Sequence, residues 1–128
     1  MEYLFLVSRI LFGGFFLLNG INHFLKGDMM TQYTTAKGVP APKIAVYGTG
    51  LLLILAGLGI ISGVYVVWAV LALVIFLIPI TFIMHAFWKA TEPNMKMTET
   101  IMFMKNIALT GAALAYLFVP EPWAFSLF

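Results

Sequence analysis

The chain has 128 residues, of which 62% are hydrophobic and only 9% are charged, and its mean hydropathy is +1.02. An average soluble domain carries about 25% charged residues, and a domain near this size still exposes about 30% of its unfolded-chain surface, so the composition excludes a soluble fold. The absence of cysteine excludes disulfides, thiol relays and cysteine-ligated metals. Its seven Lys and Arg residues are scattered, which gives nucleic-acid binding no support.

Four apolar segments reach the length of about 20 residues that a helix needs to cross a bilayer. We expect membrane-spanning helices at residues 3–25, 44–61, 65–87 and 101–118. The first segment lacks the basic start and the small-residue cleavage site of a signal peptide. The sequence therefore predicts an all-α fold, in which residues 1–128 form one membrane domain, a four-helix bundle in contact with the lipid bilayer.

The connections between these segments differ in length. Residues 26–43 are polar, and we expect a short interfacial helix at 29–36, between the first and second spans. Residues 62–64 (Ser-Gly-Val) predict a tight hairpin, and residues 89–98 predict a polar loop with a Glu-Pro-Asn turn. The sequence thus predicts two long connections at one end of the bundle and a short one at the other.

The distribution of lysines predicts the topology. The two long connections hold Lys26, Lys37, Lys43, Lys89 and Lys96, whereas the termini and the hairpin hold no Lys or Arg. The positive-inside rule then places these connections in the cytoplasm and both termini outside. We expect a multi-pass protein of the cell (inner) membrane.

Polar residues within the spans recur at helical spacing, and such residues are candidates for function because an unpaired polar group is costly in lipid. The first and third spans run in the same direction, so His23 and His85 should lie at the same end, where Glu99 and Asn106 enter on the fourth span. Small residues beside His23 should let a neighbouring helix approach closely. If the polar faces point inward, one pocket gathers His23, His85, Asn106, Glu99, Asn19 and Asn22, with Trp88, Phe24 and Phe87 at its rim.

This pocket suits a quinone, whose carbonyl oxygens need hydrogen-bond donors and whose ring and tail need an apolar slot. The candidates for cofactor binding are His23, His85, Asn106, Asn19 and Trp88. The candidates for catalytic proton transfer are His23, His85 and Glu99, since a His pKa near 6.5 suits a relay. A less favoured alternative is haem b with both histidines as axial ligands. A zinc site is weaker still, and we expect no metal.

Other interpretations of these residues stay open. Either histidine would also suit a bond to backbone or water, and Asn106 would suit an interhelical hydrogen bond. Arg9 lies towards the opposite end, in a structural or anion-facing role: it either extends to lipid headgroups or pairs with Glu2 or Glu121. A proton-coupled transporter is disfavoured because no Asp or Glu lies deep in a span.

Several motifs resemble those of the DoxX family of small four-span membrane proteins. The opening, Arg9 and Gly14 followed by Asn-Gly-Ile-Asn-His-Phe at 19–24, resembles the start of that family, and Gly-Val-Pro at 38–40 resembles its interhelical loop. Residues 85–114 are similar to its C-terminal half, whereas Val-Pro-Glu-Pro-Trp at 119–123 departs from its usual Gly-Pro-Gly-like ending. The resemblance implies that Arg9, His23, His85 and Asn106 occupy family-pattern positions.

The resemblance also implies a class of function. The related DoxD-type proteins are membrane subunits of a thiosulfate:quinone oxidoreductase, and some DoxX proteins are tied to membrane-bound oxidoreductase assemblies that handle oxidative stress. We therefore expect a component of a quinone-linked membrane oxidoreductase, and the resemblance leaves open whether the chain is itself catalytic or is one subunit of such an enzyme. The alternative is a non-catalytic assembly subunit or homo-oligomer, whose surfaces would include the GxxxG motif at Gly59 and Gly63 and the small residues from Gly111 to Ala115.

Overall fold

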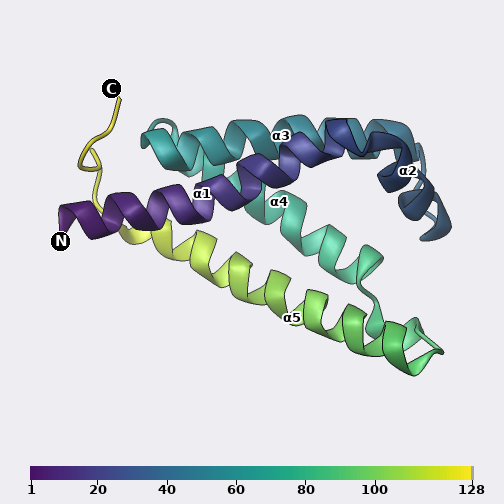
Figure 1. Ribbon diagram of the computed structural model, residues 1–128. Coiled ribbons are helices and arrows are strands. Elements are labelled where there is room, and N and C mark those ends of the chain that lie inside the picture. The colour runs from purple at the N-terminus through teal and green to yellow at the C-terminus, as the bar shows by residue number, and fades with distance from the viewer. Residues whose placement is uncertain (128) are drawn as a thin grey trace.

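The computed structural model describes residues 1–127, most of which are helical, with no strand among them (Figure 1). The elements are α1 (Glu2–Leu25), α2 (Gly27–Ala36), α3 (Pro42–Ser62), α4 (Val66–Met84), the short 3-10 helix η1 (Phe87–Lys89), α5 (Pro93–Ala115) and the 3-10 helix η2 (Tyr116–Phe118). Within this part of the chain, four helices are long and apolar enough to cross a membrane: α1, α3, α4 extended by η1, and α5 extended by η2. The expected all-α bundle is confirmed, and α2 is the helix between the first two spans.

The outer surface of these helices is apolar, as a bilayer requires. Leu11 and Leu18 on α1 are 71% and 63% exposed, and Trp68 and Ile75 on α4 are 72% and 66% exposed. A soluble protein rarely exposes a continuous apolar surface of this kind. Lipid therefore covers these side chains in a multi-pass membrane protein.

Glycines let α1 and α3 pack with their backbones nearly in contact. A Cβ atom added to Gly20 would lie 2.7 Å from the carbonyl oxygen of Gly50, and one added to Gly57 would lie 2.7 Å from the carbonyl oxygen of Gly13. Only glycine fits at these positions, which is the role of small residues between membrane helices. The predicted close approach is confirmed, and the neighbouring helix is α3.

The bundle is closed at one end and open along one side. Helix α1 packs along α3, α3 against α4, and α4 against α5, but α1 and α5 do not pack along their length. They meet near the two termini, where Ser8 Oγ lies 2.6 Å from the Tyr116 hydroxyl and the Phe12 and Tyr116 rings lie 5.1 Å apart. In Figure 1, α1 and α5 are close at this end, called here the hairpin end, and diverge towards the opposite end, called here the α2 end.

The turn between α3 and α4 is the tight hairpin that the sequence predicts. Gly63 adopts a φ of +73° and its N–H donates to the Gly59 carbonyl, which ends α3. A Cβ on Gly59 would lie 2.9 Å from that of Ala69 on α4, so the GxxxG motif is used inside the bundle and leaves no surface for another chain there.

The connection before α5 is shorter than predicted. Residues 89–98 were expected to form a polar loop, but α5 begins at Pro93, with Glu92 as its extended N-cap residue. Proline has no N–H and a fixed φ, so it is well suited to the first position of a helix. The proline that suggested a turn instead starts the fourth helix.

Candidate functional site

Arg9 is fully buried at the hairpin end. Its Nε donates to the carbonyl oxygen of Ile60 at 3.2 Å, its Nη2 to that of Ile61 at 2.7 Å, and its Nη1 to that of Ala124. The Trp123 ring centre lies 5.4 Å from the guanidinium carbon. The carbonyls at a helix C-terminus have no helical partners and carry partial negative charge, so Arg9 caps α3 and fastens the C-terminal tail to it.

The two sequence-based expectations for this arginine are therefore wrong. Arg9 does not extend to headgroups, and within residues 1–127 neither Glu2 nor Glu121 pairs with it. The reason is that backbone oxygens from α3 and the tail satisfy all three nitrogens. The structural alternative describes what the residue does.

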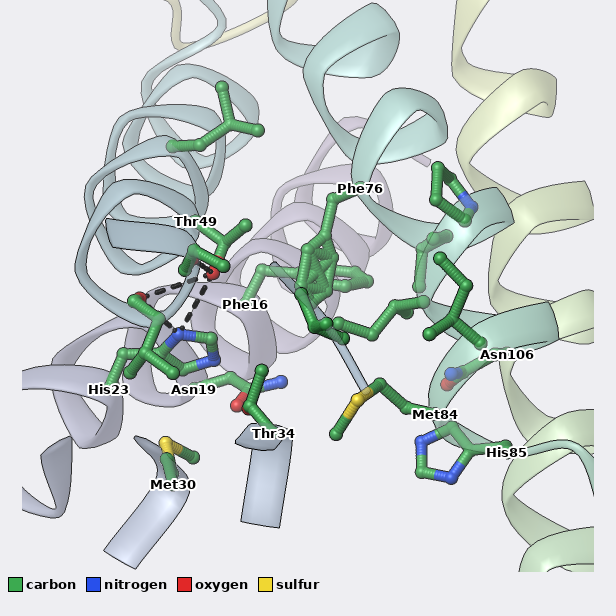
Figure 2. Close-up of a pocket in the computed structure, with 18 of the residues that line it drawn as sticks. Phe16, Asn19, His23, Met30, Thr34, Thr49, Phe76, Met84, His85 and Asn106 are labelled. Atoms are coloured by element: carbon green, nitrogen blue, oxygen red, sulfur yellow. Dashed lines mark hydrogen bonds between the residues drawn. The ribbon is translucent and has the colours of Figure 1, made fainter. Parts of the chain in front are cut away.

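A cavity of about 450 Å³ lies between the helices at the α2 end (Figure 2). Most of its wall is apolar, including Phe15, Phe16, Leu52, Phe76, Leu77, Ile80 and Met84. The polar side chains on its wall are Asn19, His23, Tyr33, Thr34, Thr49, His85, Lys105 and Asn106. The structure thus brings to one cavity four of the residues that the sequence singled out, namely His23, His85, Asn106 and Asn19.

His23 is held by the backbone of α3. Its Nδ1 lies 2.8 Å from the carbonyl oxygen of Val46 and 3.2 Å from Oγ1 of Thr49, which itself donates to Ala45. Because a carbonyl oxygen only accepts hydrogen bonds, Nδ1 carries the proton, and Nε2 of the neutral ring is an acceptor. Figure 2 shows this second nitrogen on the cavity side of the ring. His23 thus makes a backbone bond and still presents an acceptor to the cavity.

His85 is held by a carboxylate. It is the first residue after α4, where the backbone leaves the helical conformation with φ −119° and ψ 43°. Its Nδ1 donates to Oε2 of Glu99 at 3.1 Å, and its Nε2 lies on the cavity side of the ring (Figure 2). Both histidines are therefore fixed through Nδ1 and turn Nε2 towards the same space.

Glu99 lies behind this wall and joins three elements. It is only 5% exposed, and it accepts a hydrogen bond from the Tyr33 hydroxyl at 2.9 Å as well as the one from His85. Lys37 Nζ forms an ion pair with it at 3.6 Å. One carboxylate of α5 thereby holds α2 and the end of α4 together.

Tyr33, on α2 and outside the spanning helices, is affected by this carboxylate. Burial and the hydrogen bond to Glu99 raise the pKa of the Tyr33 hydroxyl to about 12. At neutral pH the phenol is therefore protonated and acts as a hydrogen-bond donor.

Asn106 presents an unpartnered amide to the cavity. It is 6% exposed, and none of residues 1–127 hydrogen-bonds its side chain, although its backbone carbonyl accepts from Thr110. In Figure 2 the amide points into the cavity near Met84 and His85. No side-chain nitrogen or oxygen of the described residues is fully buried without a hydrogen-bond partner, so the amide atoms of Asn106 border the open space of the cavity. The interhelical hydrogen bond considered for Asn106 is not formed, and its amide is available to a molecule in the cavity.

The aromatic rim expected from the sequence is not formed around this cavity. Trp88 is 50% exposed and lies on η1, where its ring packs 5.9 Å from that of Phe103. Phe24 packs against Tyr47 instead, at 5.4 Å. Because α4 ends at Met84, the helical spacing that placed Trp88 on the same face as His85 no longer applies.

A metal site from both histidines and a glutamate is not assembled in the described part of the chain. Residues 1–127 hold no group of three His, Asp or Glu side chains close enough to share an ion. Glu99 approaches His85 from Nδ1, the nitrogen that faces away from the cavity.

Sequence reasoning missed Lys105. Its side chain lines the cavity, and its Nζ lies 5.6 Å from the ring centre of Phe15 on α1. The signal was present, because a cation one residue before Asn106 interrupts an apolar segment long enough to span the membrane. Tyr33, Thr34 and Thr49 were also missed, since nothing local indicates that α2 and α3 turn these residues towards the histidines.

Four spanning helices around a largely apolar cavity, into which several polar side chains project, define a small multi-pass membrane protein with an internal site. The DoxX family model matches residues 4–86, more than half of the chain, so the chain belongs to the DoxX family. The match includes His23 and His85 and ends before α5, which carries Glu99 and Asn106. No curated protein and no solved structure matches the chain.

Proposed function

We propose that this protein is the membrane component of a quinone-linked oxidoreductase system and that the cavity at the α2 end holds the quinone head group. The observation that carries the proposal is the amide of Asn106, which has no protein partner among the described residues and borders the same cavity as Nε2 of His23 and His85. A quinone supplies a two-electron, two-proton carrier that is soluble in the bilayer. The protein's part is to bind, orient and exchange protons with it.

The walls of the cavity suit a ring with oxygens at its edges. Asn106 donates from its amide to a carbonyl oxygen, while Phe16, Phe76 and Met84 form an apolar slot around the ring. The volume of about 450 Å³ falls within the range of about 300–1,000 Å³ that is usual for small-molecule sites. In the tautomer that carries its proton on Nδ1, His23 accepts a hydrogen bond at Nε2 from a ring hydroxyl and so favours the reduced form.

His85 and Glu99 provide a route for protons. Nε2 of His85 accepts a proton on the cavity side, and Nδ1 passes one to Glu99, 3.1 Å away. Glu99 contacts Lys37, whose side chain is 23% exposed, so the route reaches the surface at the α2 end. The positive-inside rule assigns that end to the cytoplasm.

Organic extraction and mass spectrometry of the purified full-length protein test the proposal. We expect stoichiometric quinone in the wild type and at least a tenfold loss in the His23→Ala/His85→Ala variant, since about 1.4 kcal/mol of lost binding energy is already tenfold. Gln32→Ala, an exposed position on α2, is the control and retains quinone. Thermal unfolding verifies that all three proteins are folded.

Two results would overturn the proposal. The first is a wild type that carries no quinone above the amount in an equal mass of bulk lipid. The second is a haem absorption band in the wild type that is lost in the double variant, because both histidines then ligate iron.

The alternative, a non-catalytic assembly subunit, is favoured by one observation on α5. A Cβ added to Gly111 meets nothing within 4 Å among the described residues, so this face of a spanning helix is open to another helix. A purified complex whose activity survives the His23→Ala/His85→Ala change would support this alternative.

A further inference from the structure

The cavity opens sideways towards the lipid. Phe15 on α1 and Ile75 on α4 both line it, yet they are 40% and 66% exposed. Both lie in the middle of helices that cross the bilayer. Their exposed sides therefore face acyl chains, so at these two side chains the wall of the cavity reaches the hydrocarbon region.

This lateral opening lies between α1 and α5. On the hairpin side it is closed by the contacts of Ser8 and Phe12 with Tyr116, and at the α2 end the Tyr33–Glu99 hydrogen bond closes it. Between these closures, one contact that joins α1 to α5 is that of Lys105 Nζ with the Phe15 ring, at 5.6 Å. Both residues line the cavity, so a flexible lysine stands at its lipid-facing entrance.

Lys105 has no anionic partner within residues 1–127. Its Nζ donates a hydrogen bond to Sδ of Met102, at 3.5 Å. Glu99 is instead paired with Lys37, Tyr33 and His85. Lys105 lies twelve residues beyond Pro93, the start of α5, which is about 18 Å along the axis. An unpaired cation this far along a spanning helix favours a counter-anion.

The cavity itself supplies no such anion. No Asp or Glu is among the described residues that line it, and His23 donates its Nδ1–H to a carbonyl oxygen. The neighbouring Asn106 adds an unpartnered amide donor beside Lys105. The electrostatics of the cavity therefore favour a molecule that carries negative charge on an oxygen.

We propose that the cavity admits phenol-type amphiphiles from the bilayer through the opening between α1 and α5, and that Lys105 binds the ring oxygen in its phenolate form. The apolar tail stays in the lateral opening, in contact with lipid, while Asn106 binds beside the ring. This inference rests on the proposed function in taking the same cavity as the occupied site. It adds the route of entry, the ionised state of the occupant and the residue that recognises it.

An ionisable, coloured probe tests the role of Lys105. The full-length protein in nanodiscs of neutral phosphatidylcholine is titrated with 2-decyl-4-nitrophenol, whose phenolate is read from its visible absorbance. A cation within hydrogen-bonding reach lowers the pKa of a bound acid by about 1 unit or more. We expect this shift in the wild type and in Lys105→Arg, its loss in Lys105→Gln, and no change in the control Lys96→Gln, an exposed position on the same helix.

The methyl ether of the probe cannot ionise, and it separates charge recognition from loss of the fold. It should bind the wild type and Lys105→Gln with equal affinity. A Lys105→Gln protein that leaves the pKa of the bound phenol unchanged contradicts the proposal, because the lysine then extends to lipid phosphates instead of into the cavity.

A probe with a diazirine in the middle of its decyl chain tests the route. Photolabelling that excess unlabelled probe suppresses should fall on α1 near Phe15 and on α5 near Lys105. Labels confined to α2 and α3 would place the tail elsewhere and overturn the lateral route. If the His23→Ala/His85→Ala variant loses its quinone but the wild type does not shift the pKa of the bound probe, this inference alone is rejected. If the wild type shifts the pKa of the probe but carries no quinone, only the proposed function is rejected.

Discussion

The hydroxyl group of Tyr33 on α2 donates a hydrogen bond of 2.9 Å to Oε1 of Glu99 on α5. Helix α2 packs mainly on α3 and more weakly on α1, so Glu99, through Tyr33 and Lys37, links it to the other half of the bundle. The closed state of the α2 end of the cavity therefore depends on one carboxylate.

The ionisation of Tyr33 should report this link. Its pKa of about 12 exceeds that of an unfolded tyrosine, about 10. The contribution of the protonated phenol to stability is therefore complete below about pH 10 and is lost as the pH rises through about 12. Glu99→Gln removes the negative carboxylate that accepts the hydrogen bond from Tyr33 and should therefore lower the pKa of the Tyr33 hydroxyl.

Tyrosinate absorbance measures the effect. The absorbance of the wild type and of Tyr33→Phe should rise alike near pH 10, and the two proteins should differ by one tyrosinate only near pH 12. When both proteins also carry Glu99→Gln, this difference should appear at a lower pH. A Tyr33→Phe protein that has already lost one titrating group near pH 10 would show that Tyr33 is not bonded to Glu99.

Two glycines on α1 should respond in opposite ways to alanine. In Gly20→Ala the new Cβ lies 2.7 Å from the Gly50 carbonyl oxygen and 2.9 Å from the Ile54 nitrogen, so the backbones must separate, at a cost of about 1–3 kcal/mol of unfolding free energy. In Gly14→Ala the Cβ meets nothing within 4 Å, and the higher helix propensity of alanine raises stability by up to about 1 kcal/mol. Unfolding in detergent compares the two; equal effects would contradict the close packing of α1 on α3.

Arg9→Met should destabilise the protein without affecting the cavity. The change leaves the carbonyls of Ile60, Ile61 and Ala124 without their charged donor, and we expect a loss of about 3 kcal/mol. Trp123, 3% exposed beside Arg9, should show red-shifted fluorescence as the tail detaches. Lys43→Met, an exposed position on α3, is the control. Loss of quinone at unchanged stability would instead mean that Arg9 acts on the site.

Asn106→Leu separates a binding role from a structural one. The leucine removes an amide that has no partner among the described residues and borders the cavity, so the unfolding free energy of the protein without ligand should stay nearly the same. The quinone retained on purification should fall about tenfold, the equivalent of about 1.4 kcal/mol of lost binding energy. A marked loss of stability with unchanged quinone would show that the amide serves the fold.

Local properties of the sequence determined the spans and their order. The lengths of the apolar segments predicted four spanning helices, and Gly63 predicted the hairpin. Because the first and third spans run in the same direction, the sequence also placed His23 and His85 at one end of the bundle. These predictions succeeded because the length of an apolar segment, the conformation of a glycine and the direction of a span each depend on residues that are close together in the sequence.

The partners of the polar side chains were decided only by the tertiary structure. Arg9 was expected at the lipid surface, but a tail carbonyl 115 residues away satisfies it. Trp88 does not lie at the predicted rim because α4 ends at Met84. Lys105 lies at the lateral opening because α1 and α5 diverge there. Each residue of a spanning segment contributes independently to the hydrophobicity that the bilayer requires, so the spans can be found in the sequence. A hydrogen bond between helices, or an opening between them, forms only when distant segments pack together.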